Sequence, residues 1–436
     1  MSDISILELH ESLRDPVMLS MNLLNEIASE HPDAISFAAG RPLEDIFRTE
    51  FLHEYLDTFT THLTENRAHS TEEIRRTLYQ YGRTKGIVHD LVAEYLRIDE
   101  GIEIDPEAIV MTVGCQEAMF LVLRALRVDE RDVVLAVAPT YFGLNGAARL
   151  LDMPVVNVDS GHLGIDLDHL KQQIRRTRDV GLRPRALYLL PDFSNPTGLS
   201  LSLGTRNRLL EIARREGIFL LEDNPYGLFR ADGGARVPSL KALDTDRTVI
   251  HLGSFSKTGL PGARVGFVVA DQRVAVDGHR VSLLSDQLSL LKSNVTLNTS
   301  PIAQALIGGK LLQNGCSMLR ANQREIQIYG DNLRRVLRNL EQRFPADSGV
   351  SWNSPAGGFF VIVTVPFTVN DKSLERSARE HGVIWTPMHH FYEGLSSSQQ
   401  IRLSFSLLTS ERIDEGMERL ASFVSCENRS HIEPPA

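Results

Sequence analysis

Residues 248–266 read TVIHLGSFSKTGLPGARVG, so an apolar run leads directly into Ser254, Ser256, Lys257 and Arg264. Burying a lysine at the end of an apolar strand costs free energy unless its charge is paired or lost. A desolvated amine of this kind can form a Schiff base with an aldehyde, and two hydroxyls with an arginine suit a phosphate monoester. The stretch predicts a site for a phosphate-bearing aldehyde. The alternative is that Lys257 reaches the surface and the serines cap a turn.

Outward from this stretch, short apolar runs alternate with amphipathic stretches. The runs are AIVMTVG (108–114), DVVLAVAP (132–139), PVVNVD (154–159), RALYLLP (185–191), IFLLED (218–223), TVIHLGS (248–254) and RVGFVVA (264–270). Continuous apolar runs indicate strands buried on both faces, as in a parallel sheet. Residues 116–128 and 203–217 place apolar side chains three and four positions apart, which indicates helices on a sheet face. The pattern predicts an α/β domain with a doubly wound, mostly parallel sheet.

The alternation of strand and helix stops near residue 300. Helical patterns continue from about 300 to 344. Strands at 358–365 and 399–406, with helices near 371–381 and 410–425, predict a smaller α+β domain. We expect a large domain over 50–315 and a small one over 316–425, with 1–49 packing against the small domain and 426–436 disordered.

Composition and charge narrow the classes of function. Hydrophobic residues make up 42% of the 436 residues and charged residues 23%, which is typical of a globular protein. A net charge of −10 disfavours binding to nucleic acid or to an anionic membrane. Three cysteines are too few for a disulfide framework or a thiolate metal cage, and the N-terminus does not resemble a signal peptide. We expect a cytoplasmic protein without a membrane span, a nucleic-acid partner or a metal site.

Two further polar segments follow predicted strands. Asn195 lies in DFSNPTG (192–198), and Asp223 and Tyr226 lie in LEDNPY (221–226). The carboxyl edge of a parallel sheet is the usual ligand side. Asp223 can keep a pyridinium nitrogen protonated, and Asn195 and Tyr226 can hydrogen-bond a ring hydroxyl. With Lys257, these groups match the needs of pyridoxal phosphate, although a plain turn and a helix cap would explain the same segments.

Three further groups of residues, before or after these segments in the chain, complete the set of candidate site residues. Gly114, Cys115 and Gln116 join a strand to a helix, where backbone N–H groups can hold a phosphate, and Cys115 there is a packed residue rather than a nucleophile. Tyr141 ends the next strand and offers a ring for stacking, or belongs to the core. Arg402 lies in a strand of alternating apolar and polar residues, and its guanidinium suits bidentate binding of a carboxylate. Arginines are, however, also common in edge strands that bind no ligand.

Taken in order, these pieces resemble the fold-type-I aminotransferases of class I/II over residues 15–425. The matching pieces are GRP (40–42), YG (81–82), GCQ (114–116), Tyr141, SNPTG (194–198), Asp223 with Tyr226, SFSK (254–257) with Arg264, PAGGFF (355–360) and Arg402. The resemblance implies pyridoxal 5′-phosphate as cofactor, Lys257 as the Schiff-base lysine, and transfer of an amino group between an amino acid and a 2-oxo acid.

The same resemblance implies a role for each matching residue. Asp223 would pair with the pyridine nitrogen, Tyr226 and Asn195 would contact the ring hydroxyl, and Tyr141 would stack on the ring. The phosphate would be held by Gly114, Cys115, Gln116, Ser254, Ser256 and Arg264, joined by Tyr81 of a neighbouring subunit in a homodimer with shared active sites. Arg402 would bind the substrate carboxylate, in a substrate site that includes Gly40 and Arg41.

Within that family the chain is similar to the aminotransferases that make hydroxyphenylglycine and dihydroxyphenylglycine for peptide antibiotics. The similarity lies in DAISFAAGRP (33–42), LYQYG (78–82), HLGSFSKTGLPGARVG (251–266), VIWTPM (383–388) and IRLSFS (401–406). It implies a nonproteinogenic, arylglycine-like substrate. Two departures stand out: Cys115 replaces the hydroxyl residue of many relatives, and Met388–Tyr392 stands where relatives have a glycine. The second departure predicts either a specialised substrate wall or a solvated turn.

Two other functions would use similar residues. Lyases and cyclases that act at Cβ or Cγ of an amino acid such as S-adenosylmethionine share every cofactor residue. An aminotransferase-like ligand-binding domain of a regulator would carry an N-terminal winged helix, whereas only about 30 residues precede the fold here and the charge is acidic. Transamination is the prediction that the whole set of motifs favours.

Overall fold

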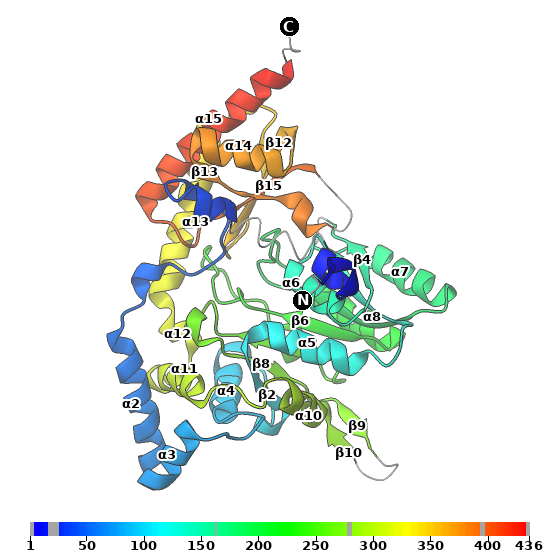
Figure 1. Cartoon of the computed structure of the whole chain (residues 1–436), viewed down its shortest axis with the longest axis vertical. Helices are drawn as coiled ribbons and strands as arrows, with labels where there is room; N and C mark the ends of the chain where they lie inside the picture. The colour runs from blue at the N-terminus through cyan, green and yellow to red at the C-terminus, as the bar shows by residue number, and fades with distance from the viewer. Residues whose placement is uncertain (1–3, 16–25, 162–163, 277–280, 393–396, 433–436) are drawn as a thin grey trace.

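A sheet of seven strands forms the centre of the large lobe in the computed structural model, which describes residues 4–15, 26–161, 164–276, 281–392 and 397–432 (Figure 1). In spatial order its strands are β2 (Ile109–Thr112), β8 (Gly266–Val269), β7 (Val249–Ser254), β6 (Phe219–Asp223), β5 (Arg183–Leu189), β3 (Asp132–Ala138) and β4 (Val155–Asp159). Neighbouring strands run parallel except at β8, which is antiparallel to β2 and β7. The predicted doubly wound, mostly parallel sheet is confirmed.

Helices cover both faces of this sheet, and further helices pack outside them. The helices of this lobe are α2 (Glu50–Glu65), α3 (Thr71–Tyr79), α4 (His89–Tyr95), α5 (Gly114–Leu126), α6 (Phe142–Arg149), α7 (Leu167–Asp179), α8 (Leu203–Glu216), α9 (Leu240–Leu243), α10 (Leu284–Val295), α11 (Pro301–Gln313) and α12 (Met318–Ala321), of which α2 and α3 pack on α11. Val134 faces a core with α5, α6 and α10, whereas the next residue, Leu135, faces a core with α7 and α8. Successive strand side chains point to opposite faces, so strands covered on both sides must be apolar throughout.

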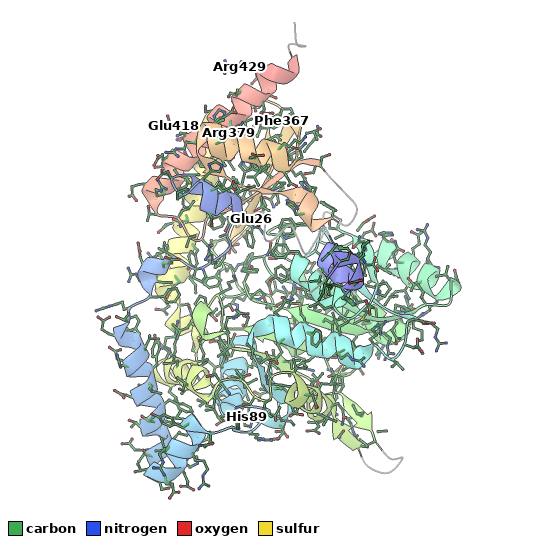
Figure 2. All side chains as sticks on the ribbon, in the orientation of Figure 1. Glu26, His89, Phe367, Arg379, Glu418 and Arg429 are labelled. Atoms are coloured by element: carbon green, nitrogen blue, oxygen red, sulfur yellow. The ribbon has the colours of Figure 1, made fainter. Side chains whose placement is uncertain are left out.

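The small lobe is built on an antiparallel sheet. In the described residues its strands are, in order, β11 (Ser351–Trp352), β12 (Phe360–Val369), β15 (Ser398–Ser404) and β14 (Thr386–Pro387). Against it pack α13 (Gln323–Arg343), α14 (Asp371–His381) and α15 (Ser410–Ile432), which Figure 1 shows together at the C-terminal end of the molecule. Figure 2 shows how side chains fill both lobes, with Arg379 and Glu418 labelled in the small lobe and His89 in the large one.

The N-terminal segment divides between the lobes, which corrects the prediction that all of 1–49 packs with the small one. Strand β1 (Ile35–Ser36) pairs in parallel with β13 (Val383–Ile384), and Phe37 joins the small-lobe core. The earlier elements η1 (Ile6–Glu8) and η2 (Glu11–Arg14) instead lie by α6, where Asp15 forms an ion pair of 2.9 Å with Arg149. Residues 16–25, between these parts, lie outside the described residues.

The boundary between the lobes falls inside α13 rather than at residue 316. Tyr329 packs with the large-lobe core, whereas Leu333 and Val336 pack with the small-lobe core. The predicted helical stretch 300–344 is also broken, because Gly315 and Cys316 adopt positive φ angles of 58° and 54° between α11 and α12. A helix cannot continue through consecutive left-handed residues.

The predicted disordered tail begins too early. Helix α15 continues through Ile432, so residues 426–432 are helical, while 433–436 lie outside the described residues. Phe423 and Val424 anchor the preceding turn in the small-lobe core, and a helix anchored in this way propagates at low cost into polar sequence. None of the described helices is long and apolar enough to cross a membrane. The remaining short elements are η3 (Glu44–Ile46), η4 (Leu96–Glu100), η5 (Pro106–Ala108), η6 (Pro261–Ala263), η7 (Met388–Phe391) and the hairpin β9 (Arg273–Ala275) with β10 (Val281–Leu283).

Candidate active site

The side chain of Lys257 lies in the loop after β7, at the carboxyl edge of the parallel strands. Its Nζ donates a hydrogen bond of 2.6 Å to the backbone carbonyl of Gly40. Burial, followed by the nearby charges of Arg402, Arg264 and Arg41, lowers the pKa of Lys257 to about 8. An amine with this pKa is deprotonated far more often at neutral pH than an exposed lysine. Lys257 is therefore positioned and tuned to act as a nucleophile and as a base.

Asp223 is the last residue of β6 and is 4% exposed. Its Oδ2 accepts a hydrogen bond of 2.7 Å from the Tyr188 hydroxyl, and its Oδ1 accepts one of 3.5 Å from the Cys115 thiol. Burial raises the pKa of Asp223, while these two donors oppose that rise. The carboxylate is thus held in place within a desolvated site, where its interaction with a cation is strong.

The N-terminus of α5 and Arg264 form an anion cradle. Gly114 begins α5 with a φ of 70°, and a Cβ there would come within 2.5 Å of the Arg264 guanidinium. Arg264 Nη1 in turn donates a bond of 3.3 Å to the Ser256 hydroxyl, and the Ser254 hydroxyl accepts from the Ser256 backbone N–H at 3.1 Å. A helix N-terminus, a guanidinium and hydroxyls are suited to a phosphate.

Two predicted phosphate contacts have other partners for their side chains. The Cys115 thiol faces Asp223, and burial raises its pKa well above the usual range, so it is a neutral donor rather than a nucleophile. The Gln116 amide donates a bond of 2.7 Å to the Gly143 carbonyl. What these two residues leave for an anion is their backbone N–H groups in the first turn of α5.

Three residues predicted to surround the cofactor ring lie near one another. Burial, the Asp223 carboxylate and the Cys115 thiol raise the pKa of Tyr141 to about 12. Tyr226 is 4% exposed, and burial raises its pKa still further, so both phenols remain hydroxyl donors. Asn195 forms side-chain hydrogen bonds with Tyr226 and with Arg402. It thereby connects the residues predicted to surround the cofactor ring to the Arg402 guanidinium.

Arg402 lies in β15 of the small lobe and reaches towards the large lobe. Its Nη1 donates to Asn195 Oδ1 at 2.6 Å, and its Nη2 donates to the carbonyl of Ala38 at 2.6 Å and to the Thr386 hydroxyl at 3.1 Å. The guanidinium lies 4.5 Å from the ring centre of Phe360 and 4.8 Å from that of Phe391. Its Nε is buried and finds no hydrogen-bond partner among the described residues. Such a buried donor is suited to an anionic ligand.

Backbone carbonyls of residues 38–41 tie the N-terminal segment across the site. Besides Ala38 and Gly40, the carbonyl of Arg41 accepts from the Ser406 hydroxyl at 2.7 Å. Gly40 has no room for a side chain, because a Cβ would lie 2.6 Å from the Phe360 ring. Arg41 itself is exposed and acts on Lys257 through its charge.

The segment Met388–Tyr392 forms a wall beside Arg402. Met388 and Phe391 are each 1% exposed, and the Phe391 ring lies 5.6 Å from that of Phe142. His389 and His390 are also buried, so the alternative of a solvated turn is wrong. The 3₁₀ turn η7 buries these residues because apolar side chains of both lobes meet there, which local sequence does not reveal.

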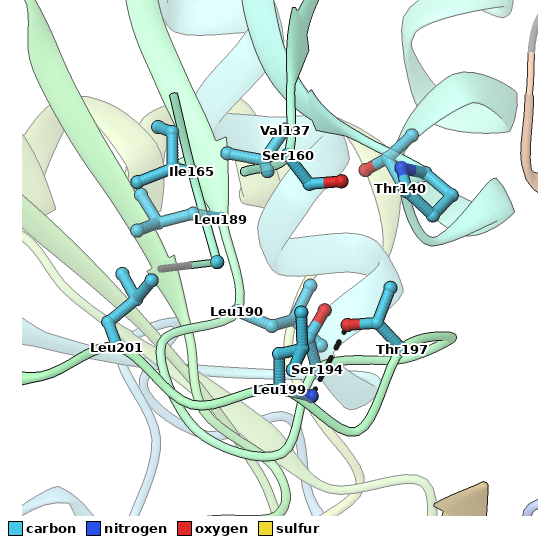
Figure 3. A pocket seen from close by; sticks show the side chains of 12 residues that line it. Val137, Thr140, Ser160, Ile165, Leu189, Leu190, Ser194, Thr197, Leu199 and Leu201 are labelled. Carbon is cyan, nitrogen blue, oxygen red and sulfur yellow. Dashed lines mark hydrogen bonds between the residues drawn. The ribbon is translucent and has the colours of Figure 1, made fainter. Parts of the chain in front are cut away.

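A separate apolar pocket lies behind the turn that carries Asn195. Figure 3 shows it lined by Val137, Ile165, Leu189 and Leu201, with Ser194 and Thr197 at one side. Thr197 Oγ1 accepts a hydrogen bond of 3.3 Å from the Leu199 backbone N–H, the dashed line of Figure 3. Leucine packing and this bond support the turn and so set the position of Asn195.

Tyr81 stands apart from the other predicted residues. It follows α3 and is 84% exposed, so in a single chain it does not line the buried site. Motif reasoning also missed Tyr188, and it gave no role to Thr386 of VIWTPM or Phe360 of PAGGFF. Tyr188 sits inside the apolar run RALYLLP, and a phenol in a fully buried strand is the one signal that a hydrogen-bond partner was needed.

Known proteins that are similar to this chain in sequence or structure are aminotransferases. Residues 54–420 match the family aminotransferase class I and II. The chain is 55% identical over 428 residues to the (S)-3,5-dihydroxyphenylglycine transaminase of Amycolatopsis orientalis, covering 98% of this chain and 96% of that one. The kynurenine aminotransferase of Pyrococcus horikoshii, solved with pyridoxamine phosphate, superposes with a TM-score of 0.80 at 28% identity, covering 96% of each chain.

A third relative bears on the cofactor. The α-aminoadipate aminotransferase LysN of Thermus thermophilus, solved with a phosphopyridoxyl-leucine adduct, superposes with a TM-score of 0.75 at 29% identity. It covers 97% of this chain and all of its own. The lysine, the buried carboxylate and the anion cradle described above fit a phosphopyridoxyl group. The chain therefore belongs to the class I and II aminotransferases, fold-type-I enzymes that depend on pyridoxal phosphate.

Proposed function

We propose that this aminotransferase exchanges an amino group between an arylglycine-like amino acid and a 2-oxo acid. The observation that carries the proposal is the aromatic enclosure of Arg402 by Phe360 and Phe391, at 4.5 and 4.8 Å. In an arylglycine the ring is bonded directly to Cα. Aromatic walls must then begin right beside the group that binds the substrate carboxylate. Similarity to a transaminase named for (S)-3,5-dihydroxyphenylglycine supports the same substrate class.

Arg402 holds the carboxylate in this proposal. Asn195, Ala38 and Thr386 fix the guanidinium plane, so its remaining N–H groups keep one orientation. Burial lowers the pKa of Arg402 to about 10, which leaves it cationic at neutral pH. A fixed, desolvated guanidinium whose Nε has no partner among the described residues binds a carboxylate by a charged hydrogen bond and orients the Cα–H bond.

Lys257 moves the proton. Its Nζ, once free of the cofactor, takes the proton from the substrate Cα and returns a proton on the way to the 2-oxo acid. A pKa of about 8 suits both directions of that transfer. The Gly40 carbonyl, 2.6 Å from Nζ, holds the amine on the side of the site where Arg402 lies.

The other predicted residues hold the cofactor. Gly114, Cys115 and Gln116 offer backbone N–H groups to the phosphate, together with Ser254, Ser256 and Arg264. Asp223 pairs with the ring nitrogen, Tyr226 and Asn195 with the ring hydroxyl, and Tyr141 with the ring face. Bound pyridoxal phosphate supplies an electron sink for the charge left on Cα. Asp223 sustains that sink, because its carboxylate keeps the ring nitrogen protonated.

We further propose a homodimer in which Tyr81 reaches the phosphate of the partner's site. Apolar side chains are exposed on the segment that surrounds Asn298, namely Leu290, Val295, Leu297 and Ile302 at 43–63% exposure. Gly82 lies beside Asn298 in the same region. A patch of this kind on a described surface is typical of an interface. We also propose that the enzyme works in the cytoplasm, a reducing compartment that keeps Cys115 and Cys316 as thiols.

A panel of amino acids tests the substrate class. Phenylglycine, 4-hydroxyphenylglycine and 3,5-dihydroxyphenylglycine are compared with phenylalanine and tyrosine, and the visible absorbance of the lysine-bound cofactor is followed in single half-reactions. We expect an arylglycine to give the highest second-order rate constant for the loss of this absorbance. A preference for phenylalanine or tyrosine would refute the proposal. Release of ammonia without a need for a 2-oxo acid would instead indicate a lyase.

A pair of phenylalanine variants serves as the control for the aromatic wall. Phe391→Leu should lower the preference for arylglycines, because it removes a ring beside Arg402. Phe367→Leu changes an equally buried ring in the small-lobe core, which packs on Phe423 rather than on the site. Equal loss of preference in both variants would mean that lobe stability, not the wall, sets specificity.

A further inference from the structure

Two adjacent histidines and a carboxylate converge behind the substrate wall. His389 and His390 belong to η7, and Asp371 is the first residue of α14. His389 Nε2 lies 3.2 Å from Asp371 Oδ1, and His390 Nε2 lies 2.8 Å from the same oxygen. The two imidazole rings lie side by side, with centres 4.1 Å apart and planes tilted by 40°. Three atoms suited to bind a metal thus face one point.

Burial makes this arrangement costly without a cation or a proton between the groups. The side chains of His389 and His390 are 6% and 5% exposed, whereas that of Asp371 is 44% exposed. Asp371 Oδ1 is itself shielded from solvent. Both Nε2 atoms face one carboxylate oxygen, so either a proton on each nitrogen or a bound cation must lie between the rings and Asp371.

The distances suit a transition metal. Ligand atoms about 2.0–2.1 Å from a zinc ion lie roughly 3 Å apart from one another in tetrahedral or octahedral geometry. The two nitrogen–oxygen separations of 3.2 and 2.8 Å fall in that range. Two imidazoles and one carboxylate favour zinc and its neighbours over magnesium or calcium, which prefer oxygen ligands. The exposed side of Asp371 leaves an entry path and room for water as a further ligand.

We propose that Asp371, His389 and His390 form a binding site for a divalent transition-metal ion, with Zn²⁺ as the preferred ion. The site replaces the earlier expectation that the chain has no metal site. It would take no part in amino transfer, because none of its three ligands is among the residues that surround Lys257, Asp223 or Arg402. Bound metal would tie η7 to the start of α14. It would thereby hold Met388 and Phe391 of the wall in place.

Calorimetric titration of the holoenzyme with Zn²⁺ tests the site. The protein should carry no oligohistidine tag and should first be treated with a chelator and dialysed. We expect one Zn²⁺ per chain, and a visible absorption band in the region of Co²⁺ d–d transitions when Co²⁺ is used instead. His390→Ala and Asp371→Asn should each weaken Zn²⁺ binding at least about tenfold. Zn²⁺ should raise the thermal midpoint of the wild-type protein and not that of the two variants.

His169→Ala is the matched control, because His169 also lies 3.2 Å from a carboxylate, Asp159, but belongs to no cluster of metal-ligating side chains among the described residues. This variant should bind Zn²⁺ as the wild type does. Wild-type protein that takes up no Zn²⁺, or takes it up equally after both substitutions in the cluster, would overturn the proposal. The same holds if binding disappears in His169→Ala. Circular dichroism and cofactor absorbance establish whether each variant is folded. If a variant is not folded, the number of Zn²⁺ ions bound per wild-type chain still tests the proposal.

Discussion

Lys257 and Arg402 are two basic side chains in one desolvated site, and burial affects their protonation differently. Arg402 keeps its proton, since a guanidinium loses it only at high pH, and aromatic rings and three acceptors surround it. Lys257 has a single acceptor, the Gly40 carbonyl, and the arginine charges disfavour its protonated form. The site therefore contains one permanent cation for binding and one amine that titrates for chemistry.

The titration of Lys257 should appear in the reaction of the apoenzyme with pyridoxal phosphate. Only the neutral amine attacks the aldehyde. With a pKa of about 8, roughly a tenth of Lys257 is neutral at pH 7, and nearly all of it above pH 9. We expect the rate constant of capture to rise with pH and level off above about 8. Stopped-flow absorbance of the lysine-bound cofactor measures it.

Arg41→Gln is the control for this pH profile. The variant removes one of the three positive charges that lower the pKa of Lys257, so the midpoint should move to higher pH. Arg41 is exposed, and its backbone carbonyl contact with Ser406 does not depend on its side chain. A wild-type midpoint near that of an ordinary lysine would contradict the role of burial.

Arg402→Lys should raise KM for amino acids strongly and change kcat less. A lysine cannot form two parallel hydrogen bonds to a carboxylate, and about 2 kcal/mol of binding should be lost. Steady-state kinetics with several amino acids measure the effect. Arg412→Lys, on the exposed surface of α15, should leave KM unchanged. An unchanged KM in Arg402→Lys would mean that another group binds the carboxylate.

Among the helices and strands, we expect the N-terminus of α5 to bind the cofactor phosphate. The strand β2 ends at Thr112, and α5 begins two residues later at Gly114. Gly266 on the neighbouring strand β8 packs against this turn so closely that a Cβ would lie 2.7 Å from the Cys115 nitrogen. Two glycines thus allow a helix end, a strand and a guanidinium to meet at one point.

Gly114→Ala should weaken cofactor binding at least about tenfold. The new Cβ would collide with Arg264 at 2.5 Å, and the φ of 70° would strain the backbone by about 1–2 kcal/mol. Equilibrium dialysis of the apoenzyme with pyridoxal phosphate measures the affinity. Gly101→Ala separates the two effects, because Gly101 has a φ of 66° with open space around it. It should lose stability but keep the cofactor; equal cofactor loss in both variants would contradict the cradle.

At the scale of the whole molecule, two lobes and the N-terminal segment enclose the site. Lys257 and Asp223 come from the large lobe, Arg402 from the small lobe, and the carbonyls of Ala38 and Gly40 from the segment between β1 and α2. Because three parts of the chain share direct contacts there, small movements of the lobes would change the relative positions of the groups expected to bind the substrate. Tyr81 remains outside this enclosure and exposed.

Mixed dimers test whether Tyr81 completes the partner's site. Lys257→Ala and Tyr81→Ala proteins are co-refolded, and heterodimers are isolated with two different affinity tags. If sites are shared, one site of each mixed dimer carries both defects and the other carries none. Activity should then rise towards roughly half of wild type in the isolated mixed dimer, and towards roughly a quarter in the random mixture before isolation. A mixed dimer without recovered activity would show that both residues serve the same chain's site.

Tyr79→Ala is the matched control for Tyr81→Ala. Tyr79 is 77% exposed, two residues before Tyr81, at the end of α3. It should leave the activity of the homodimer near that of wild type. Loss of activity in Tyr79→Ala would mean that the segment folds or assembles poorly, and the effect of Tyr81→Ala could then not be assigned to its phenol.

Much of the fold and most of the site follow from local sequence. Each strand of the large sheet was visible as an apolar run, since strands buried on both faces must be apolar along their length. Lys257, Asp223 and Asn195 followed from polar residues at the ends of those strands. Helix ends were less predictable. The left-handed residues Gly315 and Cys316 break a helical pattern, and the core contacts of Phe423 and Val424 prolong another.

The chemical groups of the site are recognisable from their neighbours along the chain: a lysine, a carboxylate after an apolar strand, a helix end suited to an anion, and an arginine. Their contact partners depend on how the chain folds. The Cys115 thiol contacts Asp223 rather than phosphate, Phe360 and Phe391 enclose Arg402, and Asp371 meets two histidines. The reason is physical. Strand and helix patterns are set by short-range spacing, whereas these contacts join residues far apart in sequence that meet only when the lobes pack.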